Sequence, residues 1–353
     1  MAGGGLTFPA FRSRAPWWGR DLQTLRNSLV AGHGPGLADF PGKRLEFPMS
    51  DGSGDRLLGT LHNPKNDAGR PLVVVIHGLT GSEDSVYVRV STRRFLDLGY
   101  PVLRLNLRGA GPSQGHCQSR YHAGRSEDLR QVLGSMDGRL AGRGLLLVGY
   151  SLGANLLLKY LGEAGRRAMV LGAVSISAPI DLDRARSAIM RPRNLFYHRY
   201  LLARLKEETT GLPLSTEERR ELAAVRTLYE FDDRILAPRI GFAGAPDYYR
   251  RSMALPYLSA IAVPTLIIQA EDDPWIPFAT YRDFAWSMNS RLVPLFARGG
   301  GHVGFHGRSS PIPWQDRCMA RPSSLPRRAA GARRSSSRGT PSRRSPTRSA
   351  PSC

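Results

Sequence analysis

The sequence predicts an α/β protein with a mostly parallel, doubly wound sheet of about eight strands. Short apolar runs, each long enough for a buried strand, alternate along the chain with segments of helical pattern. One run, residues 145–148, leads into Gly149-Tyr150-Ser151-Leu152-Gly153, and a helical pattern follows at once. A strand, the G-x-S-x-G pattern and a helix in succession are the context of a nucleophilic serine on a sharp turn.

The remaining elements follow from periodicity and turn residues. An antiparallel hairpin is expected first, around the turn at residues 51–54. Ser126 is the expected N-cap of the third helix. The expected strands are 43–49, 56–62, 72–76, 101–106, 145–148, 170–177, 265–269 and 291–296, and the expected helices are 21–29, 90–98, 126–136, 154–160 and 278–288.

Changes in pattern and composition divide the chain into four parts. Residues 1–41 are irregular apart from the short helix, and residues 42–178 and 261–307 form the α/β core. Residues 179–260 are helical, charged and rich in aromatics, and are expected to be an insertion into the core. Residues 308–353, with eleven arginines and one acid, are expected to be a basic, disordered tail.

The length, net charge and composition of the chain narrow the class of protein. The chain has 353 residues and a net charge of +21, and its 41% hydrophobic content suffices for a large core. Three scattered cysteines fit neither a disulfide framework nor a zinc cluster, and no metal-ligand spacing or phosphate-binding loop is present. No signal peptide or membrane span is apparent, so we expect a cytoplasmic protein without a metal or cofactor.

Ser151 is the candidate nucleophile. Its turn must be sharp enough to expose Oγ, and Gly149 and Gly153 leave room where two backbone segments nearly touch. The alternative is a serine in an ordinary strand-to-helix turn.

A serine hydroxyl needs a base, and the base needs an orienting acid. In this type of fold the acid and the histidine come after the serine, each behind a later strand. Asp272 and Asp273 follow the strand at 265–269, and His302 follows the last strand within a glycine-rich loop. We prefer Asp273, four residues before Pro277, and keep Asp272 as the alternative acid.

An oxyanion hole requires two backbone N–H groups aimed at the oxygen that becomes negative. Leu152, directly after the nucleophile, is expected to supply one. The loop at residues 77–81 is expected to supply the other, from Leu79, and His77 is interpreted as a structural residue that shapes this loop.

Taken together, these motifs resemble the α/β-hydrolase family and, more narrowly, its YheT-like branch. The residues that carry the resemblance are Asp21–Thr24, 77–82, 106–109, 121–124, 149–155, 230–233, 247–249, 272–274 and 300–305. The resemblance implies a serine carboxylesterase with Ser151 as nucleophile, Asp273 as acid and His302 as base. It also implies that residues 179–260 are the lid.

The predicted function is hydrolysis of short-chain acyl esters through an acyl-enzyme, with a small acyl ester as the substrate. The alternative is a lipid hydrolase of the monoacylglycerol lipase or phospholipase type. A binding module that kept the fold without turnover is the non-enzymatic alternative.

The C-terminal region departs from the resemblance, because relatives close with a helix beside the sheet where this chain has Arg/Ser/Pro-rich sequence. Two interpretations are open. The tail could be a genuine basic segment that contacts nucleic acid through counterion release, or a reading-frame shift could have replaced the native end. We favour the frame shift.

Overall fold

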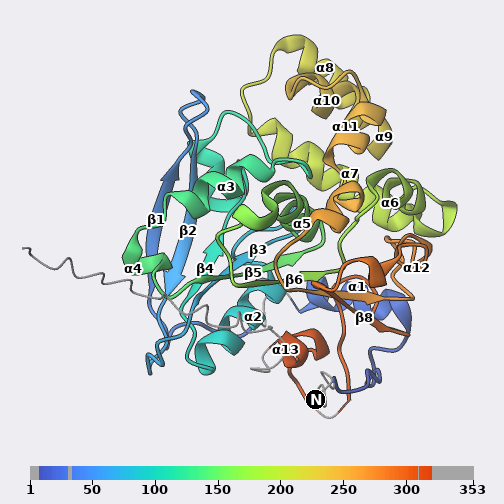
Figure 1. The fold of residues 1–353 in the computed structure, drawn as a ribbon. Coiled ribbons are helices and arrows are strands. Elements are labelled where there is room, and N and C mark those ends of the chain that lie inside the picture. Colours follow the sequence, from blue (N-terminus) through green and yellow to red (C-terminus); the bar gives the residue numbers. More distant parts are fainter. Residues whose placement is uncertain (1–7, 31–33, 309, 320–353) are drawn as a thin grey trace, which may run out of the picture.

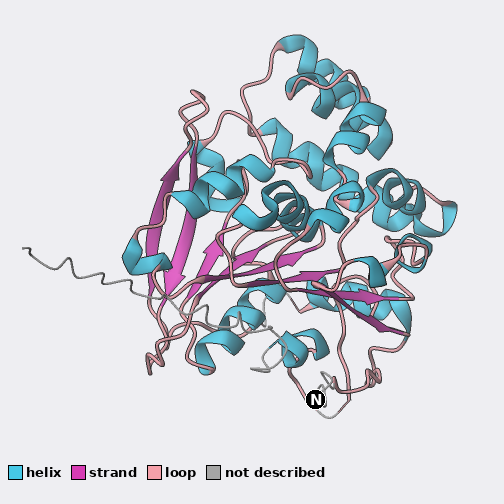
Figure 2. Cartoon of the chain, in the orientation of Figure 1, coloured by secondary structure: helices cyan, strands magenta, loops and turns pink. Residues whose placement is uncertain are grey.

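Eight strands form one sheet, in the order β1-β2-β4-β3-β5-β6-β7-β8 (Figure 1). The computed structural model describes residues 8–30, 34–308 and 310–319. β1 and β4 each pair antiparallel with β2, and every other neighbouring pair is parallel. Figure 2 shows the strands in magenta: β1 (Gly42–Pro48), β2 (Arg56–His62), β3 (Leu72–Ile76), β4 (Val102–Leu105), β5 (Leu145–Tyr150), β6 (Gly172–Ile176), β7 (Thr265–Ala270) and β8 (Leu292–Ala297). The predicted fold class and the entry hairpin are confirmed.

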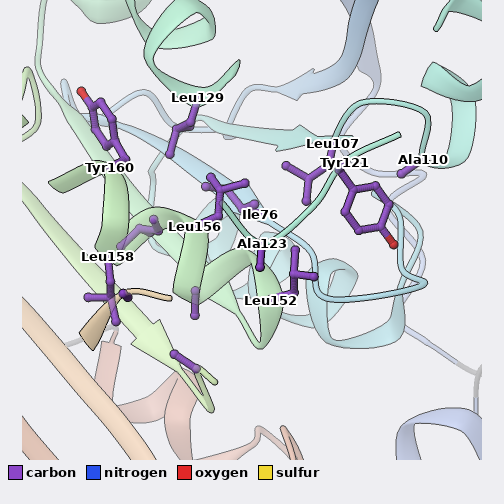
Figure 3. Packing of buried hydrophobic residues seen from close by; sticks show 14 of the residues in the cluster. Ile76, Leu107, Ala110, Tyr121, Ala123, Leu129, Leu152, Leu156, Leu158 and Tyr160 are labelled. Atoms are coloured by element: carbon purple, nitrogen blue, oxygen red, sulfur yellow. The ribbon is translucent and has the colours of Figure 1, made fainter. Parts of the chain in front are cut away.

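The central strands are apolar throughout because helices cover both faces of the sheet. Alternate residues of β3 show this: Val74 and Ile76 join one buried cluster, and Val73 and Val75 join another. The first cluster contains residues of α3 and α5 and is drawn in Figure 3. The second contains residues of α2 and of the C-terminal α13.

The α-helices outside the insertion are α1 (Gly19–Leu29), α2 (Val86–Asp97), α3 (Ser126–Gly134), α4 (Gly138–Ala141), α5 (Leu152–Ala164), α12 (Ala279–Arg282) and α13 (Trp314–Met319). Of these, α1, α2, α3 and α5 lie close to predicted positions, whereas α4 and α13 were not predicted. Ser126 is the first helical residue of α3, not its N-cap, and its hydroxyl donates to Glu163 of α5. The helix expected at 278–288 is broken into α12 and a single 3₁₀ turn at Trp286–Met288.

Between β6 and β7 the chain leaves the sheet and forms a group of helices above it (Figure 1). These are α6 (Leu182–Ile189), α7 (Leu195–Thr210), α8 (Thr216–Ala224), α9 (Leu228–Phe231), α10 (Ala237–Arg239) and α11 (Ala245–Ser252), with the π-helical turn η5 (Asp232–Leu236) between α9 and α10. Their inward side chains, such as Leu201 and Phe231, belong to the first core cluster. No helix within the described residues combines the length and apolar character needed to cross a bilayer.

The expected start of the disordered tail at residue 308 is wrong. Residues 314–319 form α13, in which Trp314, Cys318 and Met319 are buried in the second core cluster. The Trp314 ring stacks on Phe305, with the ring centroids 5.6 Å apart. This short helix therefore covers the sheet face that we expected to lose its covering helix. The rest of the predicted tail, residues 320–353, lies outside the described residues.

Candidate active site

Ser151 occupies the sharp turn between β5 and α5. Its backbone has φ 50° and ψ −120°, a strained conformation for a residue other than glycine. Its N–H donates to the Ile176 carbonyl at 2.8 Å. A Cβ at Gly153 would lie 2.2 Å from the His77 carbonyl oxygen, and one at Gly149 would lie 2.7 Å from Ala154 Cα. The two glycines thus allow the close packing that holds this turn.

The structure brings three predicted residues into one hydrogen-bonded chain. His302 Nε2 lies 2.9 Å from Ser151 Oγ, and His302 Nδ1 lies 2.8 Å from Asp273 Oδ2. The other Asp273 oxygen accepts the backbone N–H groups of Trp275 and Ile276, at 2.8 and 3.0 Å. Since a carboxylate only accepts, Nδ1 of the neutral ring carries the proton and Nε2 accepts from the serine hydroxyl. This arrangement has the proton order that a general base requires.

Asp272, the alternative acid, has a different place. Its Oδ1 accepts the Gly301 N–H at 2.9 Å, in the loop that carries His302. Burial raises the pKa of Asp272, and the Gly301 N–H opposes that effect. The structure therefore places Asp272 in contact with the histidine loop backbone and Asp273 in contact with the imidazole.

Trp275 covers one face of the imidazole. The Trp275 and His302 ring centroids are 4.3 Å apart, with the planes inclined by 31°. Tyr197 of α7 makes an edge-to-face contact with the same indole, with the ring centroids 5.5 Å apart. The indole links the histidine to the inserted helices and shields the ring from solvent.

Leu79 and Leu152 present backbone N–H groups near Ser151. Both residues line the cavity at the serine, and neither N–H makes a hydrogen bond within the described part of the chain. The other N–H groups of the Leu79 loop are occupied: Gly78 donates to the Tyr87 hydroxyl at 3.0 Å, and Thr80 to the Tyr121 hydroxyl at 2.7 Å. By elimination, the Leu79 N–H is the one this loop leaves for a ligand.

His77 holds the loop in place and stays neutral. Its Nε2 accepts the Leu107 N–H at 3.1 Å, so Nδ1 carries the proton and donates to the Gly78 carbonyl at 2.8 Å. Complete burial lowers the pKa of His77 to about 4. These contacts agree with its predicted structural role.

Helix α1 contacts the loop that carries His302. The His302 backbone N–H donates to Thr24 Oγ1 at 2.8 Å, and Asn27 Nδ2 donates to the Val303 carbonyl at 3.0 Å. Gln23 bonds both backbone groups of His306, accepting its N–H at 2.7 Å and donating to its carbonyl at 3.0 Å. Three polar side chains from near the N-terminus therefore fix the path of the histidine loop.

Two cavities meet at Ser151. One is mostly apolar, with an empty volume of about 820 Å³ that is partly open to solvent, and it lies beneath the inserted helices between Leu79, Leu201 and Phe231. The other, about 980 Å³ and also partly open, has a mixed lining that includes Thr24 and His302. An ester held across the serine could thus place one part in each cavity.

The apolar cavity contains one acidic side chain, Asp232. It accepts the Tyr249 hydroxyl at 2.7 Å. Burial raises the pKa of Asp232 to about 7, against the opposing effects of the Tyr249 hydrogen bond and the charges of Arg120 and Arg186. A carboxyl group whose charge changes near neutral pH therefore lies in the mostly apolar wall, which Arg120 and Arg186 also line.

Sequence reasoning missed the residues that position Ser151 and His302 from distant parts of the chain. Gln23 and Thr24 sit in a short amphipathic helix whose sequence does not say which side faces the protein. Trp275 and Tyr87 look like ordinary core aromatics. The only available signal was the resemblance, which included Asp21–Thr24 without giving those residues a role.

Comparison with known proteins agrees with the fold. The pattern of the "Alpha/beta hydrolase family" matches residues 73–312. The chain therefore belongs to the α/β-hydrolase family.

Its place within the family follows from individual relatives. The chain is 33% identical over 273 residues to "Putative esterase YheT" of Escherichia coli, covering 75% of this chain and 78% of that protein. It belongs to the YheT-like branch. It is also 27% identical over 260 residues to "Monoacylglycerol lipase" of Saccharomyces cerevisiae, covering 70% of this chain but only 58% of that protein.

A solved structure shares the fold at low identity. The esterase Pf2001 of Pyrococcus furiosus superposes with a TM-score of 0.54 at 18% identity, covering 80% of this chain and 93% of that one. The chain is thus an α/β hydrolase with esterase and lipase relatives.

Proposed function

We propose that this chain is a serine carboxylic ester hydrolase that works through an acyl-enzyme. The observation that carries the proposal is the hydrogen-bonded series Ser151–His302–Asp273, with distances of 2.9 and 2.8 Å, beside two free N–H groups. These are the parts that acyl transfer to a hydroxyl requires.

In the proposed mechanism His302 Nε2 takes the proton from Ser151 Oγ as the oxygen attacks the ester carbonyl. The N–H groups of Leu79 and Leu152 stabilise the negative oxygen that forms. Asp273 holds the Nδ1 tautomer and stabilises the imidazolium, which then protonates the departing alcohol. Water repeats the sequence on the acyl-enzyme and restores Ser151.

For the substrate we propose a short-chain acyl ester, with a lipid ester of the monoacylglycerol or phospholipid type as the second candidate. The second candidate is favoured by one observation, the apolar cavity of about 820 Å³ beside Ser151. The lining of the cavity by α6, α7 and η5 supports the proposal that residues 179–260 act as the lid.

The test is covalent labelling of the purified protein with a fluorophosphonate and turnover of p-nitrophenyl esters of increasing chain length. Ser151→Ala should abolish labelling and lower kcat by about 10⁴-fold or more. Ser135→Ala is the matched control, because Ser135 lies at the end of α3 and its hydroxyl donates to the Val132 carbonyl. Labelling that persists in Ser151→Ala would assign the nucleophile elsewhere.

The chain-length series separates the substrate candidates. A maximum at the acetate or butyrate ester supports the short-chain proposal, and a maximum at octanoate or longer supports the lipid alternative. Labelling without turnover of any ester would favour a binding module.

A further inference from the structure

Helix α1 has the reverse of the usual orientation for a surface helix. Its polar residues Gln23 and Thr24 are buried against the histidine loop. Its apolar residues Leu22 and Leu29 are exposed, Leu29 to 64%, and Trp18, the N-cap residue just before the helix, is exposed to 57%. Within the helix, Leu22, Leu25 and Leu29 are three and four residues apart and therefore share one stripe. A helix of this kind normally buries the apolar stripe, so this one needs another surface to cover it.

A second group of exposed apolar side chains lies on the neighbouring helix α7. Leu195, Phe196 and Tyr200 are exposed, Phe196 to 67%. Asp21 of α1 joins the two segments through Arg193 Nη2 at 2.7 Å and the Tyr197 hydroxyl at 3.0 Å. We call Trp18, Leu22, Leu29, Leu195, Phe196 and Tyr200 the entrance patch. Among the described residues, the other large apolar side chains with comparable exposure are Met169 and Met288.

The entrance patch flanks the mixed cavity that reaches Ser151. That cavity is lined by Asn27 and the exposed Ser28 of α1, by the exposed Tyr200 of α7, and by buried His302 at its inner end. Exposed Asp84, next to the start of α2, also lines this cavity, so its mouth is bordered by α1, α7 and the segment before α2. Tyr200 is the patch residue in the lining, and the patch therefore lies beside a route to the nucleophile.

The charge around the patch is strongly positive. Residues 12–29 and 191–204 together contain eight arginines and one acid, Asp21, which is paired with Arg193. Arg20, Arg191 and Arg199 are exposed. Apolar side chains set among arginines match a surface with an apolar interior and anionic head groups.

We propose that the entrance patch docks on an anionic lipid surface, with the mouth of the mixed cavity facing the lipid. The apolar side chains would insert at the level of the head groups, and the arginines would contact the phosphates. A second copy of the chain fits less well, because a two-fold interface would set the same arginines against each other. Docking deepens the proposed ester hydrolysis by giving the site direct access to acyl lipids, but binding itself does not depend on that function.

The test is co-sedimentation of the full chain with vesicles of phosphatidylglycerol and phosphatidylcholine. The triple variant Leu22→Ser, Leu29→Ser, Phe196→Ser should bind vesicles with a partition constant lowered by about tenfold or more, because three inserting side chains are lost. The double variant Met169→Ser, Met288→Ser is the matched control and should bind as the unaltered chain does. The difference between the variants should persist in about 0.5 M NaCl, where purely electrostatic binding is screened. The arginine-rich residues 320–353 are present in every variant, so they do not produce the difference.

A second readout follows Trp18. Vesicles should shift the tryptophan emission of the unaltered chain to shorter wavelength, and Trp18→Phe should lose most of that shift while still binding. Thermal unfolding of the triple variant establishes that it remains folded. Equal vesicle binding by a folded triple variant would overturn the proposal, as would a stable dimer that the triple variant abolishes.

The two proposals can fail separately. Vesicle binding by Ser151→Ala should be unchanged, and the triple variant should keep its turnover of the water-soluble acetate ester. Vesicle binding without ester turnover by any variant would reject the hydrolase and retain the docking surface.

Discussion

Ser151 and His302 are hydrogen-bonded to each other, yet they are held in place in opposite ways. Ser151 is held mainly by its own segment: β5, α5 and the two glycines within two residues of it set the turn, and the remote contacts are to the Ile176 and His77 carbonyls. His302 is fixed by side chains from distant parts of the chain, with Thr24 on its backbone and Asp273 and Trp275 on its ring. A residue that is positioned by its sequence neighbours can be recognised from a local motif. A residue that is positioned by side chains from distant segments cannot.

The largest effect should come from the acid that orients His302. Asp273→Asn should lower kcat by about 10³–10⁴-fold, because the amide donates to Nδ1 and turns the imidazole to the tautomer whose Nε2 cannot accept the serine proton. Asp272→Asn is the control and should lower kcat by about threefold or less, since its amide oxygen can still accept the Gly301 N–H. Steady-state kinetics on p-nitrophenyl acetate measures both. The reverse order of effects would make Asp272 the acid.

Next in size is the backbone packing that holds Ser151. Gly153→Ala should lower the free energy of unfolding by about 3 kcal/mol, because its Cβ would lie 2.2 Å from the His77 carbonyl oxygen. Gly134→Ala, at the end of α3 with open space around its Cβ, should instead stabilise by about 0.5–1 kcal/mol. Chemical denaturation compares the two. A harmless Gly153→Ala would show that the turn tolerates more than its geometry indicates.

A smaller effect on kcat should follow from removing a contact between α1 and the loop that carries His302. Thr24→Val keeps the shape of the side chain but removes the acceptor of the buried His302 N–H. We expect kcat to fall about tenfold with KM unchanged, because the imidazole shifts while substrate contacts remain. Thr210→Val is the matched control: the hydroxyls of Thr24 and Thr210 each donate to a carbonyl of their own helix, but Thr210 is exposed at the end of α7. Equal kcat values in the two variants would mean that Thr24 does not position His302.

The smallest effect concerns the inserted helices. There Asp232 of η5 accepts a hydrogen bond from the Tyr249 hydroxyl of α11, so this contact too joins two separate elements. Because burial raises the pKa of Asp232 from 3.8 to about 7, the folded protein binds this proton more tightly than the unfolded chain. The stability due to Asp232 is therefore fully present below pH 3.8 and is lost as the pH rises toward and through 7.

Asp232→Asn removes this titration and keeps an oxygen for the Tyr249 hydroxyl. The quantity to compare is the Tm of the unaltered protein minus the Tm of Asp232→Asn. This difference should be about 3 °C lower at pH 8 than at pH 5. Thermal unfolding at both pH values measures the change. A constant difference in Tm would indicate that Asp232 does not change its charge in this range.

Sequence alone determined the sheet, its hairpin and the local turn at Ser151, because alternating apolar runs and the G-x-S-x-G turn are set by neighbours along the chain. It also placed two adjacent acids and one histidine behind the correct strands. Only the tertiary structure shows which of those acids contacts the imidazole, since both follow β7 and Asp273 is the one that bonds His302 Nδ1. Likewise only the tertiary structure turned the polar side of α1 inward, buried Trp314–Met319 and brought Trp275 over His302. Periodicity records that a helix has two different sides, but the direction in which each side points depends on contacts hundreds of residues away.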